Sequence, residues 1–203
     1  DERLKLHPEP YFRQNLLLSK DLSIFYGDRC VANGISLTLN RGDRIALVGR
    51  NGCGKSSLLK LLIGQPIAHT GTLEIGSRLT VSYVPQDMSF LSGSADDFAA
   101  ESEIDITLFK TILRKLDFKR TQFTKDMSEF SMGQKKKVLL ARSLCQRANL
   151  YIWDEPLNYI DVISRLQIET LILEYKPTML FVEHDEAFVN DIATKVCRIS
   201  LNQ

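Results

Sequence analysis

Short apolar runs, separated by glycine and polar residues, divide this chain into predicted strands and helices. The apolar run at 44–48 is typical of a buried strand, and residues 56–63 continue from it as a helix that ends before Gly64. We expect the runs at 71–76 and 80–84 to pair with each other as a hairpin. The full set of predicted strands is 16–25, 35–39, 44–48, 71–76, 80–84, 150–153, 178–182 and 196–199.

Helical spacing of apolar residues begins further along the chain. Leu108, Ile112 and Leu116 recur at intervals that place them on one helical face. Residues 87–104 show the least order, and the small polar stretch 92–97 predicts a surface loop. Strands alternate with helices in the second half, so we expect an α/β fold with a parallel sheet covered on both faces. The other predicted helices are 120–126, 132–146, 162–174 and 185–192.

Composition favours one well-cored domain. The 203 residues carry a formal net charge of +1, so no overall basic field predicts binding to nucleic acid. No apolar run has the length of a membrane span and no signal peptide is evident, so we expect no membrane insertion and a cytoplasmic location. Four separated cysteines without C-x-x-C spacing indicate reduced thiols rather than a disulfide frame or a zinc site: Cys30, Cys53, Cys145 and Cys197.

The first fifteen residues differ from the rest of the chain. Residues 1–15 are charged and are interrupted by Pro8 and Pro10, which is typical of the end of a linker. A disordered terminus would have the same composition. The chain begins at Asp1 rather than at Met, as a fragment or a processed chain would.

The strongest chemical signal follows the strand at 44–48. Residues 49–56 read Gly-Arg-Asn-Gly-Cys-Gly-Lys-Ser, which fits the G-x-x-x-x-G-K-[ST] pattern of a phosphate-binding loop. Backbone N–H groups can surround an anion there, Lys55 can reach the β- and γ-phosphates, and Ser56 can bind Mg²⁺. A glycine-rich turn preceding a lysine by chance is the alternative, but the strand–loop–helix context favours nucleotide binding. The expected nucleotide contacts are Gly49, Asn51, Gly52, Cys53, Gly54, Lys55, Ser56 and Ser57.

Polar residues follow three other predicted strands. Asp154 and Glu155 end the strand at 150–153, where the carboxyl ends of strands in an open sheet bind ligands. Asp154 can hold Mg²⁺ through water, and Glu155 can orient or deprotonate the attacking water. His184 follows the strand at 178–182 and can stabilise charge near the γ-phosphate, whereas a structural histidine is the alternative. Gln86 follows the strand at 80–84 and can contact Mg²⁺ or the attacking water, although a single glutamine is weak evidence by itself.

Together these residues resemble the nucleotide-binding domain of an ABC ATPase. The order matches along nearly the whole chain: Walker A loop, Q-loop Gln86, signature 131–134, Walker B, D-loop Asp161 and switch His184. The resemblance implies a phosphate-loop fold with a mixed sheet core, an antiparallel β subdomain and a helical subdomain at about 87–147. It also implies that Tyr26 stacks on adenine, unless that residue is a tyrosine at the edge of the core. The resemblance divides the chain into a linker tail at 1–15 and the domain at 16–203.

The signature departs from the usual Leu-Ser-Gly-Gly-Gln of that family. Here it reads Phe-Ser-Met-Gly-Gln over 130–134, so Met132 adds bulk at a position that is usually glycine. Ser131 suits a helix N-cap, and Gly133 leaves room for a close phosphate. Family resemblance assigns Ser131, Gly133, Gln134 and Asp161 to nucleotide binding at a site shared with a second such domain.

The run Glu-Pro-Leu-Asn-Tyr-Ile-Asp at 155–161 resembles the E-P-T-N-H-L-D run of the ABC-F branch, whereas transporter domains more often end Ser-Ala-Leu-Asp. Residues 83–86 and 182–185 also resemble ABC-F, and the latter resembles the antibiotic-resistance group. This branch implies paired domains joined by a helical linker and acting on the ribosome. Residues 87–130 are too short for the arm often found in a first domain, which favours the second domain.

The resemblance therefore predicts ATP and Mg²⁺ as cofactors and an ATPase that is competent only with a second ABC domain. It also predicts that the protein acts on the ribosome and protects it from antibiotics. The motor subunit of a membrane transporter, with a membrane subunit as partner, is the alternative. A clamp that binds ATP with negligible turnover is a third possibility. Lysines at 135–137 favour a solvated helical face over a contact with ribosomal RNA.

Overall fold

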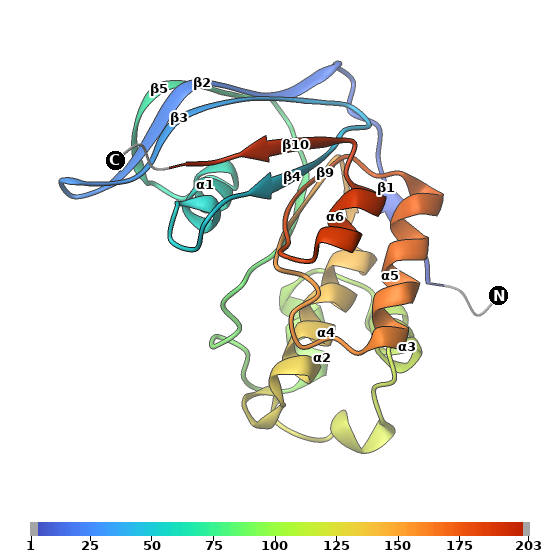
Figure 1. Cartoon of the computed structure of the whole chain (residues 1–203). Helices are drawn as coiled ribbons and strands as arrows, with labels where there is room; N and C mark the ends of the chain where they lie inside the picture. The colour runs from blue at the N-terminus through green and yellow to red at the C-terminus, as the bar shows by residue number, and fades with distance from the viewer. Residues whose placement is uncertain (1–3, 201–203) are drawn as a thin grey trace.

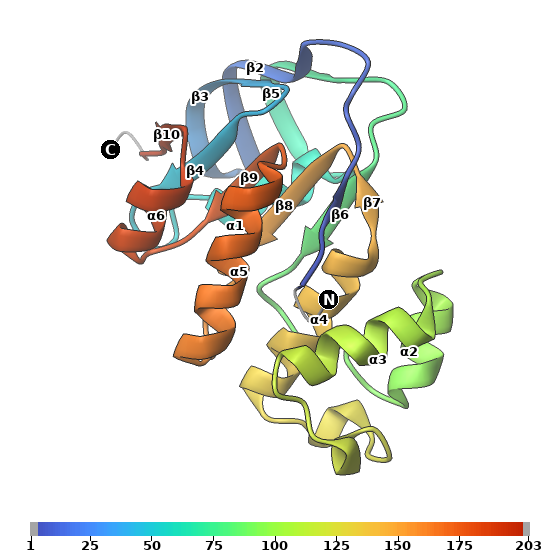
Figure 2. The same cartoon turned by 90° about the vertical axis from the view of Figure 1, so that its right-hand side faces the viewer.

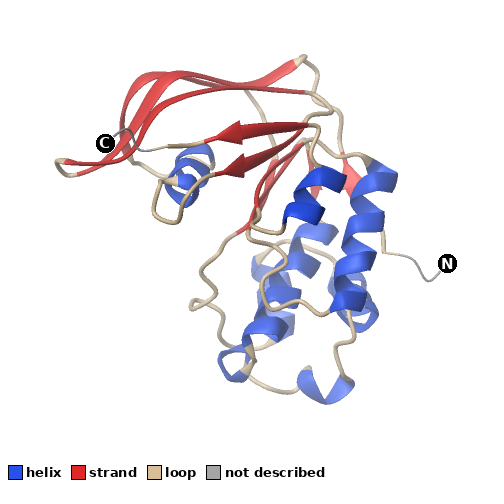
Figure 3. Cartoon of the chain, viewed as in Figure 1, coloured by secondary structure: helices blue, strands red, loops and turns tan. Residues whose placement is uncertain are grey.

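The computed structural model describes residues 4–200 and is built around a five-stranded parallel sheet of order β10-β4-β9-β8-β6. An antiparallel three-stranded sheet of order β3-β2-β5 lies over one face, and helices cover the other (Figures 1 and 3). The parallel strands are β4 (Arg44–Val48), β6 (Val81–Val84), β8 (Leu150–Asp154), β9 (Met179–Val182) and β10 (Lys195–Arg198). The antiparallel strands are β2 (Asn15–Tyr26), β3 (Arg29–Asn40) and β5 (Ala68–Ile75).

The central strands are apolar on both faces because each face has its own core. Trp153 and Phe181 contribute to a core with the helices α4 (Met132–Cys145), α5 (Val162–Tyr175) and α6 (Glu186–Ile192). Their neighbours Ile152 and Leu180 contribute to a second core with the antiparallel sheet and α1 (Lys55–Leu62). Successive side chains of a strand point to opposite faces, so continuous apolar runs are needed where both faces are covered. The expected α/β fold with both sheet types is confirmed.

The expected hairpin between 71–76 and 80–84 is wrong. β5 pairs with β2 in the antiparallel sheet, whereas β6 pairs with β8 in the parallel sheet. Residues 76–80 carry the chain from one sheet to the other. Two neighbouring strand-like runs specify that two strands exist, but the partner of each strand depends on which core its side chains enter.

The stretch 87–104 is not a continuous loop, because it contains α2 (Ala95–Glu101). Ser94 caps this helix by accepting a hydrogen bond from the Asp97 backbone N–H at 3.0 Å, and Phe98 is buried. Small polar and acidic residues suit a loop, but they also suit a helix N-terminus, and the buried Phe98 decides between the two. α3 (Ile106–Lys115) follows as expected. The stretch 120–126 contains only the short 3₁₀ turn Arg120–Gln122 instead of a longer helix, and a second 3₁₀ turn, Met127–Glu129, follows it.

The segment before β2 lies against the domain. The short strand β1 (His7–Pro8) pairs in parallel with β7 (Arg147–Ala148), and Figure 2 shows this segment running beside β6 and β7. Leu6 and Tyr11 are each 2% exposed, which accounts for an ordered position. Residues 1–3 of the expected linker tail lie outside the described residues, and the linker assignment itself stays a prediction.

Candidate active site

The loop between β4 and α1 has the strand–loop–helix form that the sequence predicts. Gly54 precedes α1 with a φ of +89°, a left-handed conformation that disfavours side chains. A Cβ at this position would also lie 2.5 Å from the carbonyl oxygen of Val31 on β3. The glycine is therefore required both by the turn and by the neighbouring strand. The exposed N–H groups of the first turn of α1 give this loop a favourable position for an anion.

Lys55 is folded into the loop. Its ammonium donates hydrogen bonds to the carbonyl oxygens of Gly49 at 2.8 Å and Arg50 at 2.9 Å. Its side chain is buried, and Cys53 is buried beside it with Sγ 3.8 Å from the ammonium. These bonds place a positive charge inside the curve of the loop, where a phosphate would meet it.

A cleft of about 700 Å³ opens over this loop, within the range of small-molecule sites. Gly49 and Cys53 do not line it: Cys53 packs beneath the loop, and Gly49 faces the neighbouring C-terminal segment, with the Ile199 carbonyl close by. Arg29 and Val31 of β3 also line the cleft, and nothing in their sequence marked them. The predicted residues that line the cleft are Tyr26, Asn51, Gly52, Gly54, Lys55, Ser56, Ser57, Gln86, Glu155 and His184.

Glu155 is held by side chains from three segments. His184 Nε2 lies 3.0 Å from Oε1, and Gln86 donates to Oε2 at 3.2 Å. Asn158 donates to the same Oε2. An ionised carboxylate only accepts, so the His184 contact needs the proton on Nε2. Asn158 was missed as a site residue because only its position three residues after Glu155 could have indicated it.

The other acidic residue, Asp154, lies below the cleft at the end of β8. It is 1% exposed, and within the described part of the chain neither carboxylate oxygen has a hydrogen-bond partner. Burial raises the pKa of Asp154, while the nearby Ser56 hydroxyl and the lysines Lys136 and Lys60 oppose this. Buried carboxylate oxygens left without donors fit a hard cation such as Mg²⁺, which binds through oxygen ligands.

The other two predicted metal ligands are adjacent to each other. Ser56 Oγ lies 3.4 Å from Gln86 Oε1, so the hydroxyl and the amide oxygen share one side of the cleft. Residues 4–200 contain no group of three or more His, Cys, Asp or Glu side chains placed to hold a metal. The oxygens of Ser56, Gln86 and Asp154 suit Mg²⁺, which is usually bound by one or two protein oxygens together with waters and substrate phosphates.

The three lysines at the start of α4 do not form a solvated face. Lys136 is 1% exposed and lies among acidic side chains. Burial lowers its pKa, and the nearby charges of Asp154, Glu155 and Glu183 act in the opposite direction. Successive helical residues point in different directions, so a run of three lysines cannot share one face. The expectation of a solvated face is therefore wrong at Lys136.

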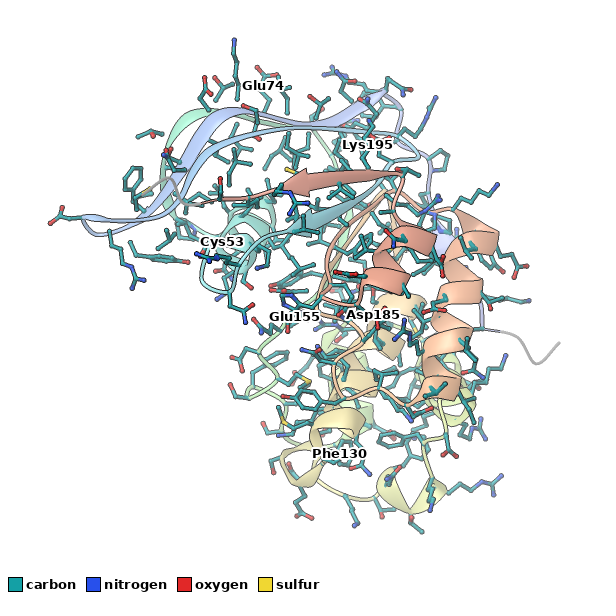
Figure 4. The ribbon with its side chains drawn as sticks, in the orientation of Figure 1. Cys53, Glu74, Phe130, Glu155, Asp185 and Lys195 are labelled. Atoms are coloured by element: carbon teal, nitrogen blue, oxygen red, sulfur yellow. The ribbon has the colours of Figure 1, made fainter. Side chains whose placement is uncertain are left out.

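Signature residues lie away from this cleft. Ser131 caps α4 by accepting from the Gln134 N–H at 3.2 Å, and Gln134 Oε1 accepts from the Ser131 N–H at 2.9 Å. A Cβ on Gly133 would lie 2.7 Å from the Tyr159 carbonyl oxygen, so the packing of this chain alone favours glycine at this position. Figure 4 shows Phe130, the preceding residue, well separated from Cys53 in the phosphate loop.

Asp161 belongs to the same surface. It caps α5 by accepting from the Ser164 N–H at 2.9 Å, and it pairs with the Lys137 ammonium at 2.7 Å. Burial would raise the pKa of Asp161, but the bonds from Lys137 and Ser164 hold it at about 2. Of the predicted nucleotide-binding residues, Ser131, Gly133, Gln134 and Asp161 are not among those that line the cleft. Their assignment to a second domain's nucleotide stays a prediction.

The loop, the acidic pair and the cleft define the chain as a phosphate-loop nucleotide-binding protein. The family model described as ABC transporter matches residues 32–158, more than half of the chain. The chain therefore belongs to the ABC transporter family of ATP-binding domains. Membership implies ATP binding and hydrolysis by domains that work in pairs.

Curated relatives belong to the ABC-F branch. The chain is 36% identical over 91% of its length to the "Putative ATP-binding protein YdiF" of Bacillus subtilis, covering 30% of that protein. It is 36% identical over 76% of its length to "ATP-binding protein Uup" of Escherichia coli, covering 26% of that protein. It is 29% identical over 92% of its length to "ABC transporter F family member 2" of Arabidopsis thaliana, covering 28%. The chain thus spans about 30% of the length of these relatives.

Solved structures show the same fold. An ATP-binding subunit of an ABC transporter superposes with a TM-score of 0.75 at 22% identity, covering 92% of this chain and 88% of that one. The archaeal ribosome recycling factor aABCE1, solved with the ribosomal stalk protein aP1, gives a TM-score of 0.73 at 25% identity, covering 96% of this chain and 38% of that one. Within residues 4–200 no helix has both the length and the apolar character needed to cross a membrane.

Proposed function

We propose that this chain is the ATP-binding and Mg²⁺-dependent ATP-hydrolysing domain of an ABC-F type protein. The observation that carries the proposal is the placement of Glu155 in the cleft above the phosphate loop, with His184 and Gln86 bonded to its two oxygens. The catalytic carboxylate, its orienting groups and Lys55 thus line one cavity.

In this proposal the cleft binds ATP at several points. Tyr26, 48% exposed at the rim, stacks on the adenine. Lys55 exchanges its loop carbonyls for phosphate oxygens, and the N–H groups of the loop bind the remaining phosphate charge. A Mg²⁺ ion bound by Ser56, Gln86 and Asp154 would neutralise charge on the β- and γ-phosphates.

Glu155 acts as the general base. His184, Gln86 and Asn158 hold its oxygens, which reduces the reorganisation needed to accept a proton from the attacking water. As Glu155 takes up the proton of the water, the Nε2–H of His184 leaves Glu155 and donates to charge that develops on the γ-phosphate. The side chain of Glu155 is 13% exposed, so little bulk water competes for it.

A second ABC domain completes the site in this proposal. Ser131, Gly133, Gln134 and Asp161 lie on a different surface from the cleft, as residues that serve a partner's nucleotide would. ATP then joins two domains and hydrolysis separates them. Residues 87–147 form the helical subdomain that carries the signature, and residues 1–15 form the end of a linker from a preceding domain.

The ribosome is the proposed target, with a role in resistance to ribosome-directed antibiotics and a cytoplasmic location. Support comes from the 155–161 run and from relatives in the ABC-F branch. The likeness to aABCE1, a ribosome recycling factor, adds a structural parallel. The second candidate is the motor subunit of a membrane transporter, and the likeness to an ATP-binding subunit of an ABC transporter supports it at the level of the fold.

Ribosome co-sedimentation of the full-length parent protein tests the proposal. Glu155→Gln should retain ATP and bind ribosomes in an ATP-dependent manner, because a domain pair that cannot hydrolyse ATP stays closed. Lys55→Ala, which removes the phosphate-binding ammonium, is the matched control and should not bind. Co-purification with a membrane subunit and no ribosome binding would favour the transporter candidate. Protection of cells from ribosome-directed drugs, measured with wild type and Glu155→Gln, tests the resistance role.

A further inference from the structure

Arg165 of α5 contacts two carboxylates outside the cleft. Its guanidinium donates from Nη1 and Nη2 to the two oxygens of Asp185, at 2.7 and 2.8 Å, and from Nε to Glu169 at 2.8 Å. A two-point contact between a guanidinium and a carboxylate fixes the relative orientation of the groups, not only their distance. Hydrogen bonds from Arg165 hold the pKa of Asp185 at about 2, so this carboxylate stays ionised.

Asp185 is the residue that directly follows His184. Besides its contact with Arg165, it caps α6 by accepting from the Phe188 N–H at 2.9 Å. Asp185 is thus fixed at both carboxylate oxygens and at the start of a helix, which fixes the backbone next to His184. The His184 side chain is itself 47% exposed, so burial does not determine where its ring points. The backbone of His184 is held by its own N–H, which donates to Glu183 Oε1 at 3.0 Å, and by the fixed Asp185 that follows. From this position the ring contacts Glu155 at 3.0 Å.

Arg165 is also connected, through Asp161, to α4, the helix that begins in the signature residues. The Arg165 N–H donates to the Asp161 carbonyl oxygen at 2.9 Å in the first turn of α5. The Asp161 side chain pairs with Lys137 of α4 at 2.7 Å. Short contacts thus run from α4 through Asp161 and Arg165 to Asp185, which is joined to His184 by the peptide bond. The path lies within one chain and joins the surface assigned to the partner's nucleotide with the chain's own cleft.

We propose that Arg165 is a positioning residue for ATP hydrolysis, which holds the His184–Glu155 contact through Asp185. The inference rests on the proposed ATPase mechanism and deepens it. Arg165 touches neither the cleft nor the phosphate loop, so its loss should lower the rate of the chemical step and leave ATP binding intact. A displacement of Asp161 by a partner domain would reach the catalytic pair by the same path.

Steady-state ATPase measurements on the full-length protein test this inference. Arg165→Gln should lower kcat about 10-fold while the Kd for ATP stays within about 2-fold of wild type. Arg165→Lys keeps the charge but loses the two-point contact, so its kcat should lie between those of wild type and Arg165→Gln. Glu169→Gln removes the charge of the other partner of Arg165 and should retain nearly full kcat. Asp185→Asn keeps a capping side chain and should reproduce the loss of kcat in Arg165→Gln. It therefore tests the same contact if Arg165→Gln fails to fold.

A double-mutant cycle separates positioning from general stability. In a His184→Ala background, single-turnover hydrolysis should fall less than 2-fold further when Arg165→Gln is added, because the contact that Arg165 holds is already absent. An equal loss in both backgrounds, or an unchanged kcat in Arg165→Gln and Asp185→Asn, would overturn the inference. Full turnover in Glu155→Gln would instead overturn the proposed mechanism, so the two failures are distinguishable.

Discussion

The cleft at the carboxyl ends of the parallel strands and the surface at the N-termini of α4 and α5 are built in opposite ways. The cleft gathers Lys55, Glu155 and His184 from three segments into one cavity. The surface satisfies its polar groups locally, through the caps at Ser131 and Asp161, and leaves large apolar side chains in solvent. These exposed side chains are Met132 at 47%, Tyr159 at 63%, Val162 at 71% and Ile163 at 73%.

The two regions are therefore under different structural constraints. In the cleft, groups far apart in sequence are held against one another, and Asp154 keeps two buried oxygens without donors among the described residues. Such an arrangement stabilises a ligand more than the fold. On the surface, capped helix ends and exposed apolar side chains fit a face that meets another domain. Four substitutions, two in each region, test whether the cleft and the surface have these separate roles.

The largest effect is expected at Glu155. Glu155→Gln should lower kcat of the full-length protein at least about 10²-fold, because an amide cannot accept the proton, while ATP binding is retained. Glu174→Gln, a substitution of a glutamate on α5, is the control and should leave kcat unchanged. Wild-type turnover in Glu155→Gln would remove this residue from the mechanism.

Lys136 tests the interior of the cleft region. Lys136→Met should lower the free energy of unfolding of the chain by about 3 kcal/mol, because removing one partner from a buried charge cluster leaves Asp154, Glu155 and Glu183 without their counter-charge. Lys135→Met, one residue earlier on the same helix, should change it by less than about 0.5 kcal/mol. Urea unfolding measures both, and equal losses in the two variants would contradict the buried role of Lys136.

Gly133 tests the surface. Gly133→Ala should lower kcat of the full-length protein about 10-fold, because the added Cβ meets the Tyr159 carbonyl and shifts the start of α4. ATP affinity of the chain's own cleft should not change, since Gly133 does not line it. Met132→Ala at the exposed neighbouring position should have a smaller effect on kcat. A weaker affinity for ATP in Gly133→Ala alone would show that the two regions are not separate.

The smallest effect is a pH dependence at Asp161. The folded pKa is about 2, below the ordinary value of 3.8, so the charged form stabilises the fold above pH 3.8. This contribution is lost as pH falls from 3.8 to about 2. The stability difference between wild type and Asp161→Asn, measured by urea unfolding, should therefore be present at pH 6 and shrink below pH 3.8. A difference that grows on acidification would contradict this assignment.

Much of the fold and the site could be predicted because the signals are local. The phosphate loop, the helix after it and the acidic pair are each specified within a few residues, and the structure places Lys55 and Glu155 on one cleft. The hairpin prediction failed because strand partners depend on distant residues. α2 was missed because a polar N-terminal turn resembles a loop until the burial of Phe98 is known.

The amino-acid sequence alone specifies a phosphate-loop motif, a carboxylate at the end of a strand and the order of motifs along the chain. Tertiary structure alone decided that Asn158 bonds Glu155, that Lys136 is buried among carboxylates and that Arg165 pairs with Asp185. The physical reason is distance. A backbone motif is specified by neighbouring residues. Burial and side-chain pairing depend instead on which elements pack together in the folded core.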